Sequence, residues 1–374
     1  MVGELARRAY RYAWPAATGR RNRPYLHDRL VALPLLAVVV FGAFGWAYAG
    51  VRDDSADIRE RLVPALVDLA DARNSLLVAQ GEAERSLAEG RAAELGGLSE
   101  RYRTRVARAT QSLNQVTRSG ALTVAEEQEL RVVSALVVDY TGWVGRAQGD
   151  AADPVLRAAE LTYARSMLCS APVAADADDA YPPCPAATGS SATSIVDRVS
   201  GLERQLRERL AHRAAWGAGV LAAAVVAGLA FLLLAAGLWR TVSFLRRRFR
   251  IRLSVPLVAA AVPLLVVPLL TADALLAQHA QDAAVPLADA LAERTSPRIE
   301  VIAEERPFGG PDPRAIEVLR ARIDDGLADG RLAFLDGAAP FVFPAGLAAA
   351  ALIVGALHGY RREYLVVTRP GAVS

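Results

Sequence analysis

The sequence predicts an all-α, multi-pass membrane protein with four transmembrane helices and an extracytoplasmic helical bundle. The first reason is the mean hydropathy, which is +0.22 although 22% of the residues are charged. Such values arise when apolar runs alternate with charged blocks along one chain. The second reason is that the net charge of these blocks changes sign from one block to the next. The third is a helical spacing of apolar residues in the blocks between the runs.

Four apolar runs contain no acid and no arginine. A spanning helix requires about 20 apolar residues, so the first two runs are long enough and the last two are at the short end of the range. For the last two, a re-entrant or interfacial hairpin is the alternative. The runs cover residues 30–50, 214–238, 255–272 and 341–357.

The segments between the runs differ in charge. Residues 1–29, 239–254 and 358–374 together contain sixteen arginines and three acids, a net charge of +13, whereas 51–213 and 273–340 together carry −10. Short loops rich in arginine stay on the cytoplasmic side, so we expect a cell-membrane protein with both termini in the cytoplasm. The basic loops then face anionic lipid headgroups, and the pI near 9.0 implies no nucleic-acid partner.

These boundaries define nine segments. Residues 1–49 also leave a signal peptide open as an alternative, because Ala47-Tyr48-Ala49 resembles a cleavage site. Residues 239–254 form a cytoplasmic Arg-rich hinge whose six arginines mark the topology: Arg240, Arg246, Arg247, Arg248, Arg250 and Arg252. In order, the segments are a basic cytoplasmic arm (1–29), TM1 (30–50), the extracytoplasmic bundle (51–213), TM2 (214–238), the hinge (239–254), TM3 (255–272), an extracytoplasmic helical hairpin (273–340), TM4 (341–357) and a cytoplasmic tail (358–374).

The bundle segment begins with an amphipathic pattern. Its seam is continuous only if Arg73 and Gln80 occupy seam positions between the apolar residues. We therefore expect a long helix with two polar residues on or beside its buried seam. The apolar seam residues are Leu62, Leu66, Leu69, Leu76, Ala83 and Leu87.

Further helices follow in the same segment. Ser119-Gly120 predicts a turn, and Thr123 with Glu126 has the spacing of a capping box that opens the next helix. Pro154 opens another helix, and the apolar spacing over 195–206 predicts a last helix that runs straight into the second span. Together these predict a four-helix or five-helix antiparallel bundle.

The second extracytoplasmic segment is shorter. A helix over 274–293 should continue the third span, interrupted at Pro286. Asp312 is suited to be the N-cap of a following helix with Pro313 at its first position. A hairpin of this size is too small for its own core, so we expect it to pack on the larger bundle.

The search for chemistry indicates a protein that is not an enzyme. All 43 basic residues are arginine, as in GC-rich, actinobacterium-like coding, which excludes a Walker A lysine and a Schiff-base lysine. No metalloprotease, nucleophile-elbow, CxxC or dinucleotide-binding motif is present. We therefore predict no catalytic residues, no cofactor and no metal.

Two pairs of residues are candidate sites. Cys169 and Cys184 enclose a loop of about fifteen residues, and in an oxidising exterior they should form a disulfide, with free thiols as the alternative. His212 and His279 follow or precede spans on the outer side and could respond to pH or bind a metal as a pair. The alternative for the histidines is a purely interfacial location.

The block DIRERLVPALVDLADARNSLLVAQGEAERSL (57–87), which follows a single span, resembles the ligand-binding helical modules of bacterial chemoreceptors and sensor histidine kinases. The stretch RRRFRIRLSVPLVAAAVPLLVVPLL (246–270) is similar to the way many sensor kinases enter their first span. The resemblance implies a sensor bundle and a homodimer. The chain departs from these families because a further span, and no signalling domain, follows the second span.

We therefore expect a non-enzymatic sensor or accessory subunit that relays to another membrane or envelope protein. A structural scaffold subunit of an envelope complex is the alternative. A transporter component is the third hypothesis, which the absence of ionisable residues within the four runs disfavours.

Overall fold

A computed structural model describes residues 22–88, 100–150, 152–169, 194–249, 255–295, 313–329 and 337–365. Across these residues the chain forms helices and short connections, without a strand, as the sequence predicts. The chain divides into two compact units. Unit 1 comprises Met1–Asp53, Trp216–Gln278 and Gly330–Ser374, and unit 2 comprises Asp54–Ala215 and His279–Asp329.

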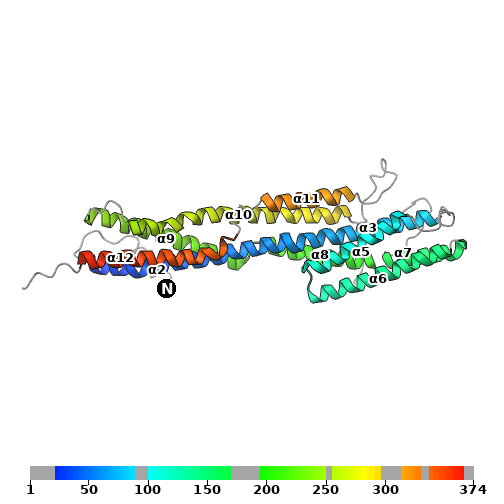
Figure 1. Ribbon diagram of the computed structural model, residues 1–374, viewed down its shortest axis with the longest axis horizontal. Helices are drawn as coiled ribbons and strands as arrows, with labels where there is room; N and C mark the ends of the chain where they lie inside the picture. Colours follow the sequence, from blue (N-terminus) through cyan, green and yellow to red (C-terminus); the bar gives the residue numbers. More distant parts are fainter. Residues whose placement is uncertain are drawn as a thin grey trace, which may run out of the picture. The chain divides into compact units, whose positions relative to one another are not determined.

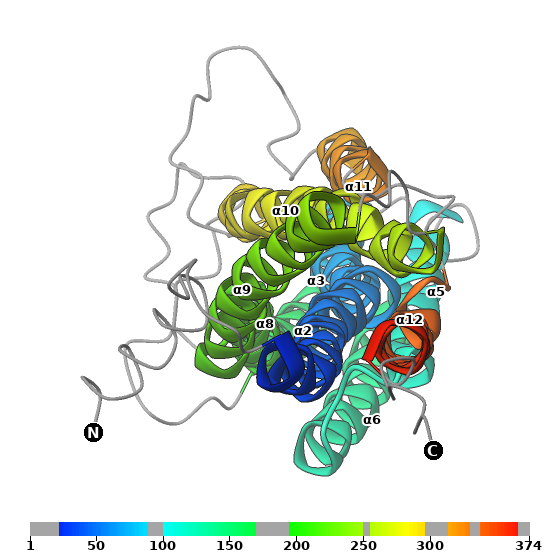
Figure 2. The ribbon, with the colours of Figure 1, turned by 90° about the vertical axis from the view of Figure 1, so that its left-hand side faces the viewer.

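Unit 1 contains the apolar helices. The described residues include four helices that are long and apolar enough to cross a membrane. Side chains from all four form one apolar core, which includes Phe41, Leu234, Leu264 and Ile353. The helices are α2 (Asn22–Asp57), α9 (Ala218–Phe249), α10 (Val255–Thr295) and α12 (Ala339–Leu365), which Figure 2 shows roughly end-on.

Helices α2 and α12 approach closely because glycines lie at their contact. A Cβ atom added at Gly346 would lie 2.3 Å from the Cβ of Phe41, and one at Gly45 would lie 3.3 Å from Cγ1 of Val342. Only glycine fits the first position, since no real Cβ contact is that short. The two helices therefore depend on a missing side chain for their packing.

Unit 2 contains the predicted bundle. Its core draws side chains from every one of its described helices. Figure 1 labels its α-helices. The elements are η1 (Ile58–Leu62), α3 (Val63–Ala88), α5 (Glu100–Ser119), α6 (Val124–Gly149), α7 (Pro154–Leu168), α8 (Ile195–Ala214), the C-terminal part of α10, and α11 (Pro313–Asp329).

The predicted seam of α3 is confirmed. All six apolar seam residues are buried, and so are Arg73 and Gln80, at 4% and 6% exposure. Residues 71–76 are buried without interruption. Because six consecutive residues point in every direction around a helix, α3 is covered on all sides at this level.

The predicted packing of the segment between the third and fourth apolar runs on the bundle is also confirmed. Ala284, Ala288 and Leu291 of α10 and Ile316 and Ile323 of α11 belong to the same core as the seam of α3. The helix α11 begins at Pro313 as expected. Its predicted N-cap, Asp312, lies outside the described residues.

Two expectations about continuity were wrong. The chain leaves the helical conformation between α8 and α9, at residues 215–217, where Ala215 has extended angles and Gly217 disfavours helix. By contrast, α10 continues through Pro286, since one missing N–H does not end a long helix. Helix α9 extends to Phe249, because arginine is a good helix former, so the first part of the segment predicted as the Arg-rich hinge is helical.

Candidate functional site

The interior of the bundle contains charged side chains. The single Nε–H of Arg108 on α5 is shared between the two carboxylate oxygens of Asp71 on α3, at 3.0 and 2.8 Å, and the hydroxyl of Ser112 donates a further hydrogen bond of 2.9 Å to Asp71. Asp71 and Ser112 are buried, whereas Arg108 reaches from the surface. This ionic contact fixes α5 against one side of α3, with the carboxylate satisfied by charge-assisted hydrogen bonds.

A second ionic contact joins α3 to α8. Nη1 of Arg73 lies 2.9 Å from Oε2 of Glu203, and it donates a hydrogen bond of 3.0 Å to the hydroxyl of Ser200. The side chains of Arg73 and Glu203 are 4% and 3% exposed. Burial raises the pKa of Glu203, while Arg73 and Arg207 oppose this shift. A buried pair of this kind is costly to break, because either partner alone is an uncompensated charge in the core.

Other buried polar atoms lack hydrogen bonds. Asn74 and Ser75 are fully buried, and neither the amide of Asn74 nor the hydroxyl of Ser75 has a hydrogen-bond partner among the described residues. The hydroxyl of Tyr140 on α6 is in the same situation, and burial raises its pKa well above the usual value. A buried polar group without a hydrogen bond lowers the stability of a core.

Farther along α3, a polar contact reaches α7. Nε2 of Gln80 donates a hydrogen bond of 2.6 Å to Oε1 of Glu84, and Arg165 of α7 lies 3.8 Å from the same oxygen. Of the two polar seam positions, Arg73 therefore contacts α8, and Gln80 contacts Glu84 within α3. Through Asp71, Glu84 and Arg73, polar contacts connect α3 with α5, α7 and α8.

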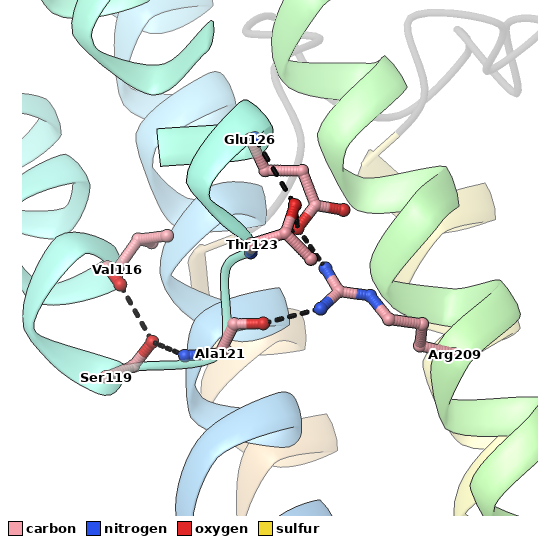
Figure 3. A network of polar contacts seen from close by, with 6 residues as sticks. All are labelled: Val116, Ser119, Ala121, Thr123, Glu126 and Arg209. Carbon is pink, nitrogen blue, oxygen red and sulfur yellow. Dashed lines mark hydrogen bonds and ion pairs between the residues drawn. The ribbon is translucent and has the colours of Figure 1, made fainter. Parts of the chain in front are cut away.

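The beginning of α6 is bound to α8 (Figure 3). The backbone N–H groups confirm the predicted capping box: Thr123 donates to Glu126 at 2.7 Å, and Glu126 donates to the Thr123 hydroxyl at 3.4 Å. Arg209 of α8 then pairs with the same Glu126 carboxylate and donates a 2.7 Å hydrogen bond to the carbonyl of Ala121. The turn before α6 is also bonded within itself, since Ser119 accepts from the Ala121 N–H.

A cavity of about 210 Å³ adjoins this contact. At its edge Arg213 pairs with Asp54 at 2.6 Å, and Arg61 pairs with Asp57 at 3.5 Å. Each arginine of the lining thus has an acidic partner, so the cavity offers no uncompensated positive charge. Its lining consists of Asp57, Arg61, Leu62, Gly120, Ala121, Leu122, Arg209 and Arg213.

The contact of α11 with α3 also contains ionisable groups. Burial raises the pKa of Asp68 on α3 from 3.8 to about 6, Arg320 of α11 opposes the shift, and Asp71 adds to it. Helix α11 therefore packs beside a carboxylate whose pKa is raised into a mildly acidic range.

Unit 1 contains one buried carboxylate that the sequence analysis did not single out. Asp273 of α10 is fully buried, accepts a 2.8 Å hydrogen bond from the hydroxyl of Tyr48, and lies 3.6 Å from Nη1 of Arg52. Asp273 is the first residue after the predicted third span. The sequence did not predict its contacts, because its two partners on α2 are 225 and 221 positions away.

The residues predicted as sites are not gathered into one place by the described structure. Cys169 is buried at the end of α7, and Cys184 lies outside the described residues, so the disulfide stays a prediction. His212 and His279 are exposed, and neither forms a hydrogen bond or an ion pair within the described ranges. The proposal of a histidine pair likewise stays a prediction.

The topology-marking arginines are described only in part. Arg240, Arg246, Arg247 and Arg248 lie in α9, while Arg250 and Arg252 lie outside the described residues. Among the residues with described positions, no group of three or more histidine, cysteine, aspartate or glutamate side chains could hold a metal ion.

Unit 2 is thus a helical bundle with an ionic interior, in a chain that also carries helices of span length. Residues 54–182, about a third of the chain, match the family model described as Actinobacterial sensor domain. This part of the chain is therefore a sensor module, and the match agrees with the arginine-only composition. No curated protein and no solved structure matched in the other two comparisons.

The matched region and the packed core differ in extent. The match contains η1, α3, α5, α6 and α7. It does not contain α8, the C-terminal part of α10 or α11, although all three contribute to the core around α3. The partner of Arg73, Glu203, lies outside the match as well.

Proposed function

We propose that the protein is a non-enzymatic membrane sensor, or the sensing subunit of a membrane complex, that relays a change in its helical bundle to a partner protein. The observation that carries the proposal is the unbroken helical structure from Asn22 to Ala88. This stretch joins an apolar helix of span length to α3, the central helix of the matched sensor module. A shift of α3 along its axis would move the apolar helix with it.

The contact at Asp273 supports a route for the relay. Tyr48 and Arg52 belong to α2, which continues into α3, while Asp273 belongs to α10, which runs from the third apolar run into the predicted second extracytoplasmic segment. A change in α2 would therefore reach the third span through this hydrogen bond and ion pair. The interruption at residues 215–217 makes α8 the less direct route.

The proposed topology follows from the charge distribution. Both termini and the Arg-rich hinge lie in the cytoplasm, and unit 2 lies outside. Single cysteines at Arg246 and at Arg103, an exposed residue of α5, test this in a variant that lacks the two native cysteines. In intact cells, a membrane-impermeant maleimide should label only the Arg103 position. Labelling at Arg246 would contradict the topology.

The relay is tested by disulfide crosslinking between α3 and α8. Pairs of introduced cysteines, one in 58–87 and one in 195–213, are compared in native membranes and in nanodiscs that contain the purified protein alone, each with and without soluble cell-wall fragments. The proposal expects the preferred pairs to change with the partner or with the fragments. A matched control pair between α6 and α7 should not change. An identical pattern under all four conditions would favour the structural scaffold instead.

A further inference from the structure

The large apolar side chains that unit 1 exposes are sorted by type along its helices. Between the ends of the apolar runs, each one that the described structure exposes is a valine or a leucine. The exposed aromatic side chains lie at or near the ends of the runs instead, with 39–76% of their surface exposed. They are Trp46 of α2, Trp216 just before α9, Trp239 of α9, and Phe341 and Phe343 of α12.

Three helices of unit 1 meet at one height beside these aromatic residues. A Cβ atom added at Gly219 of α9 would lie 3.0 Å from Cη2 of Trp46 on α2. One added at Gly45 of α2 would lie 3.3 Å from Cγ1 of Val342 on α12. The exposed aromatic residues at the beginning of α9 and α12 are within three positions of these contacts, so they share the height of Trp46. This height is the first aromatic level, and its residues are Trp46, Trp216 and Phe341.

A second aromatic level, formed by Trp239 and Tyr360, lies about the thickness of a bilayer away. On α9, Trp239 follows Gly219 by 20 residues, which correspond to about 30 Å of helix. On α12, Tyr360 follows Val342 by 18 residues, which correspond to about 27 Å. The hydrocarbon core of a bilayer is about 30 Å thick. An arginine directly follows the aromatic residue in both helices, which suits contact with anionic headgroups.

Helix α10 contains no aromatic residue, but its contact with α2 gives its height. Tyr48, which donates the 2.8 Å hydrogen bond to Asp273, lies two residues or about 3 Å beyond Trp46, on the side away from the second level. Arg52, 3.6 Å from Asp273, lies about 9 Å beyond Trp46. Asp273 is therefore close to the first aromatic level. A charge at this height avoids the cost of a position at the centre of a bilayer.

We propose that unit 1 binds the lipid bilayer between its two aromatic levels, with the outer headgroups at the first level and the inner headgroups at the second. Aromatic rings with one apolar and one wet side are favoured at both headgroup regions, and the hydrocarbon covers the valines and leucines between them. The contact of Asp273 with Tyr48 and Arg52 then lies in the outer headgroup layer. The inference gives the lipid surface of the proposed membrane sensor and so rests on that function.

Depth-dependent quenching of tryptophan fluorescence tests the inference. Three variants of the full chain each keep one native tryptophan, Trp46, Trp216 or Trp239, and carry phenylalanine at the other four tryptophan positions. Each variant is reconstituted in phosphatidylcholine vesicles whose lipids carry bromine either near the headgroup or near the end of the acyl chain. All three residues should lose more fluorescence with the shallow bromine than with the deep one, because their indole rings lie at the headgroup level.

Two controls calibrate the depth. Leu229→Trp, at an exposed position of α9 midway between Gly219 and Trp239, should lose more fluorescence with the deep bromine when it is the only tryptophan. Trp143 of α6, kept alone, should lose none with either lipid, because α6 belongs to unit 2.

The inference is overturned if Trp46 or Trp239 loses more fluorescence with the deep bromine, or if Trp216 loses none with either lipid. Quenching reports depth and is the same for both orientations of the chain in the membrane. Maleimide labelling reports the side of the membrane and crosslinking reports the response, so the inference and the proposed function can fail separately.

Discussion

Removing one partner of the buried pair between Arg73 and Glu203 should unfold the bundle at a much lower temperature. Their charged atoms lie 2.9 Å apart, and both side chains are almost completely buried. Glu203→Leu leaves the guanidinium of Arg73 without its carboxylate, which costs about 3–5 kcal/mol. Since 1 kcal/mol shifts Tm by about 2–4 °C in a domain of this size, the loss amounts to roughly 10 °C.

The double variant Arg73→Leu/Glu203→Leu separates the pair's net contribution from the cost of breaking it. Replacing both charges by apolar groups is neutral or stabilising in many proteins, so the double variant should recover most of the lost Tm. The assay is thermal unfolding of the full chain in nanodiscs, followed by circular dichroism and by hydrogen exchange of 195–214.

A matched control is the exposed pair of Arg131 and Glu127, whose atoms are 3.9 Å apart. Glu127→Gln should cost less than about 1 kcal/mol, because solvent screens the pair. The reasoning is refuted if Glu203→Leu costs no more than this control, or if the double variant is as unstable as the single one.

Three further predictions concern other sites. Burial raises the pKa of Asp68 from 3.8 to about 6, so the folded state holds this proton more tightly and the resulting stabilisation is lost as pH rises from about 4 to about 6. Asp68→Asn should therefore raise Tm at pH 7 and leave it unchanged at pH 4, and an equal Tm difference at both pH values would exclude this carboxylate as the source. Gly346→Ala should weaken the packing of α2 on α12, because the added Cβ would lie 2.3 Å from the Cβ of Phe41. In the control Gly355→Ala, the added Cβ would have no neighbouring atom within 4 Å. Cysteine crosslinking between α2 and α12 compares the two variants, and equal crosslinking efficiencies would contradict the close approach. Cys169→Ser should lower stability by about 3 kcal/mol if the second cysteine closes the predicted loop, and intact-mass analysis before and after reduction, with a 2 Da difference expected in the wild type, decides this directly.

Much of the fold could be predicted from local patterns. Helix starts such as Thr123 with Glu126, and Pro154 after an aspartate, depend on side chains within a few residues of one another, so the sequence reveals them directly. The seam of α3 was predictable for the same reason, including the burial of Arg73 and Gln80. The helix breaks were less predictable, because a proline or glycine only changes a local preference that tertiary packing can override.

Of the buried ionic pair in the candidate site, the sequence predicted the burial of Arg73 and not its partner. The heptad spacing indicates that Arg73 lies on a buried seam, but nothing near it indicates Glu203, which is 130 positions later. The same holds for Asp273 and its contacts with Tyr48 and Arg52. The identity of such partners depends on which helices pack together and in what register, and a single sequence does not show this directly.

The sequence alone therefore determined the helical class, the span-length apolar runs, the charge asymmetry and the polar seam. These depend on composition and on periodicities of three to seven residues, which are local properties of the chain. The tertiary structure alone decided that α3 is covered on all sides at residues 71–76, and that the carboxylate of Glu203 compensates the charge of Arg73. The physical reason is that burial and charge compensation depend on neighbours that are distant in sequence and adjacent only after the helices have packed.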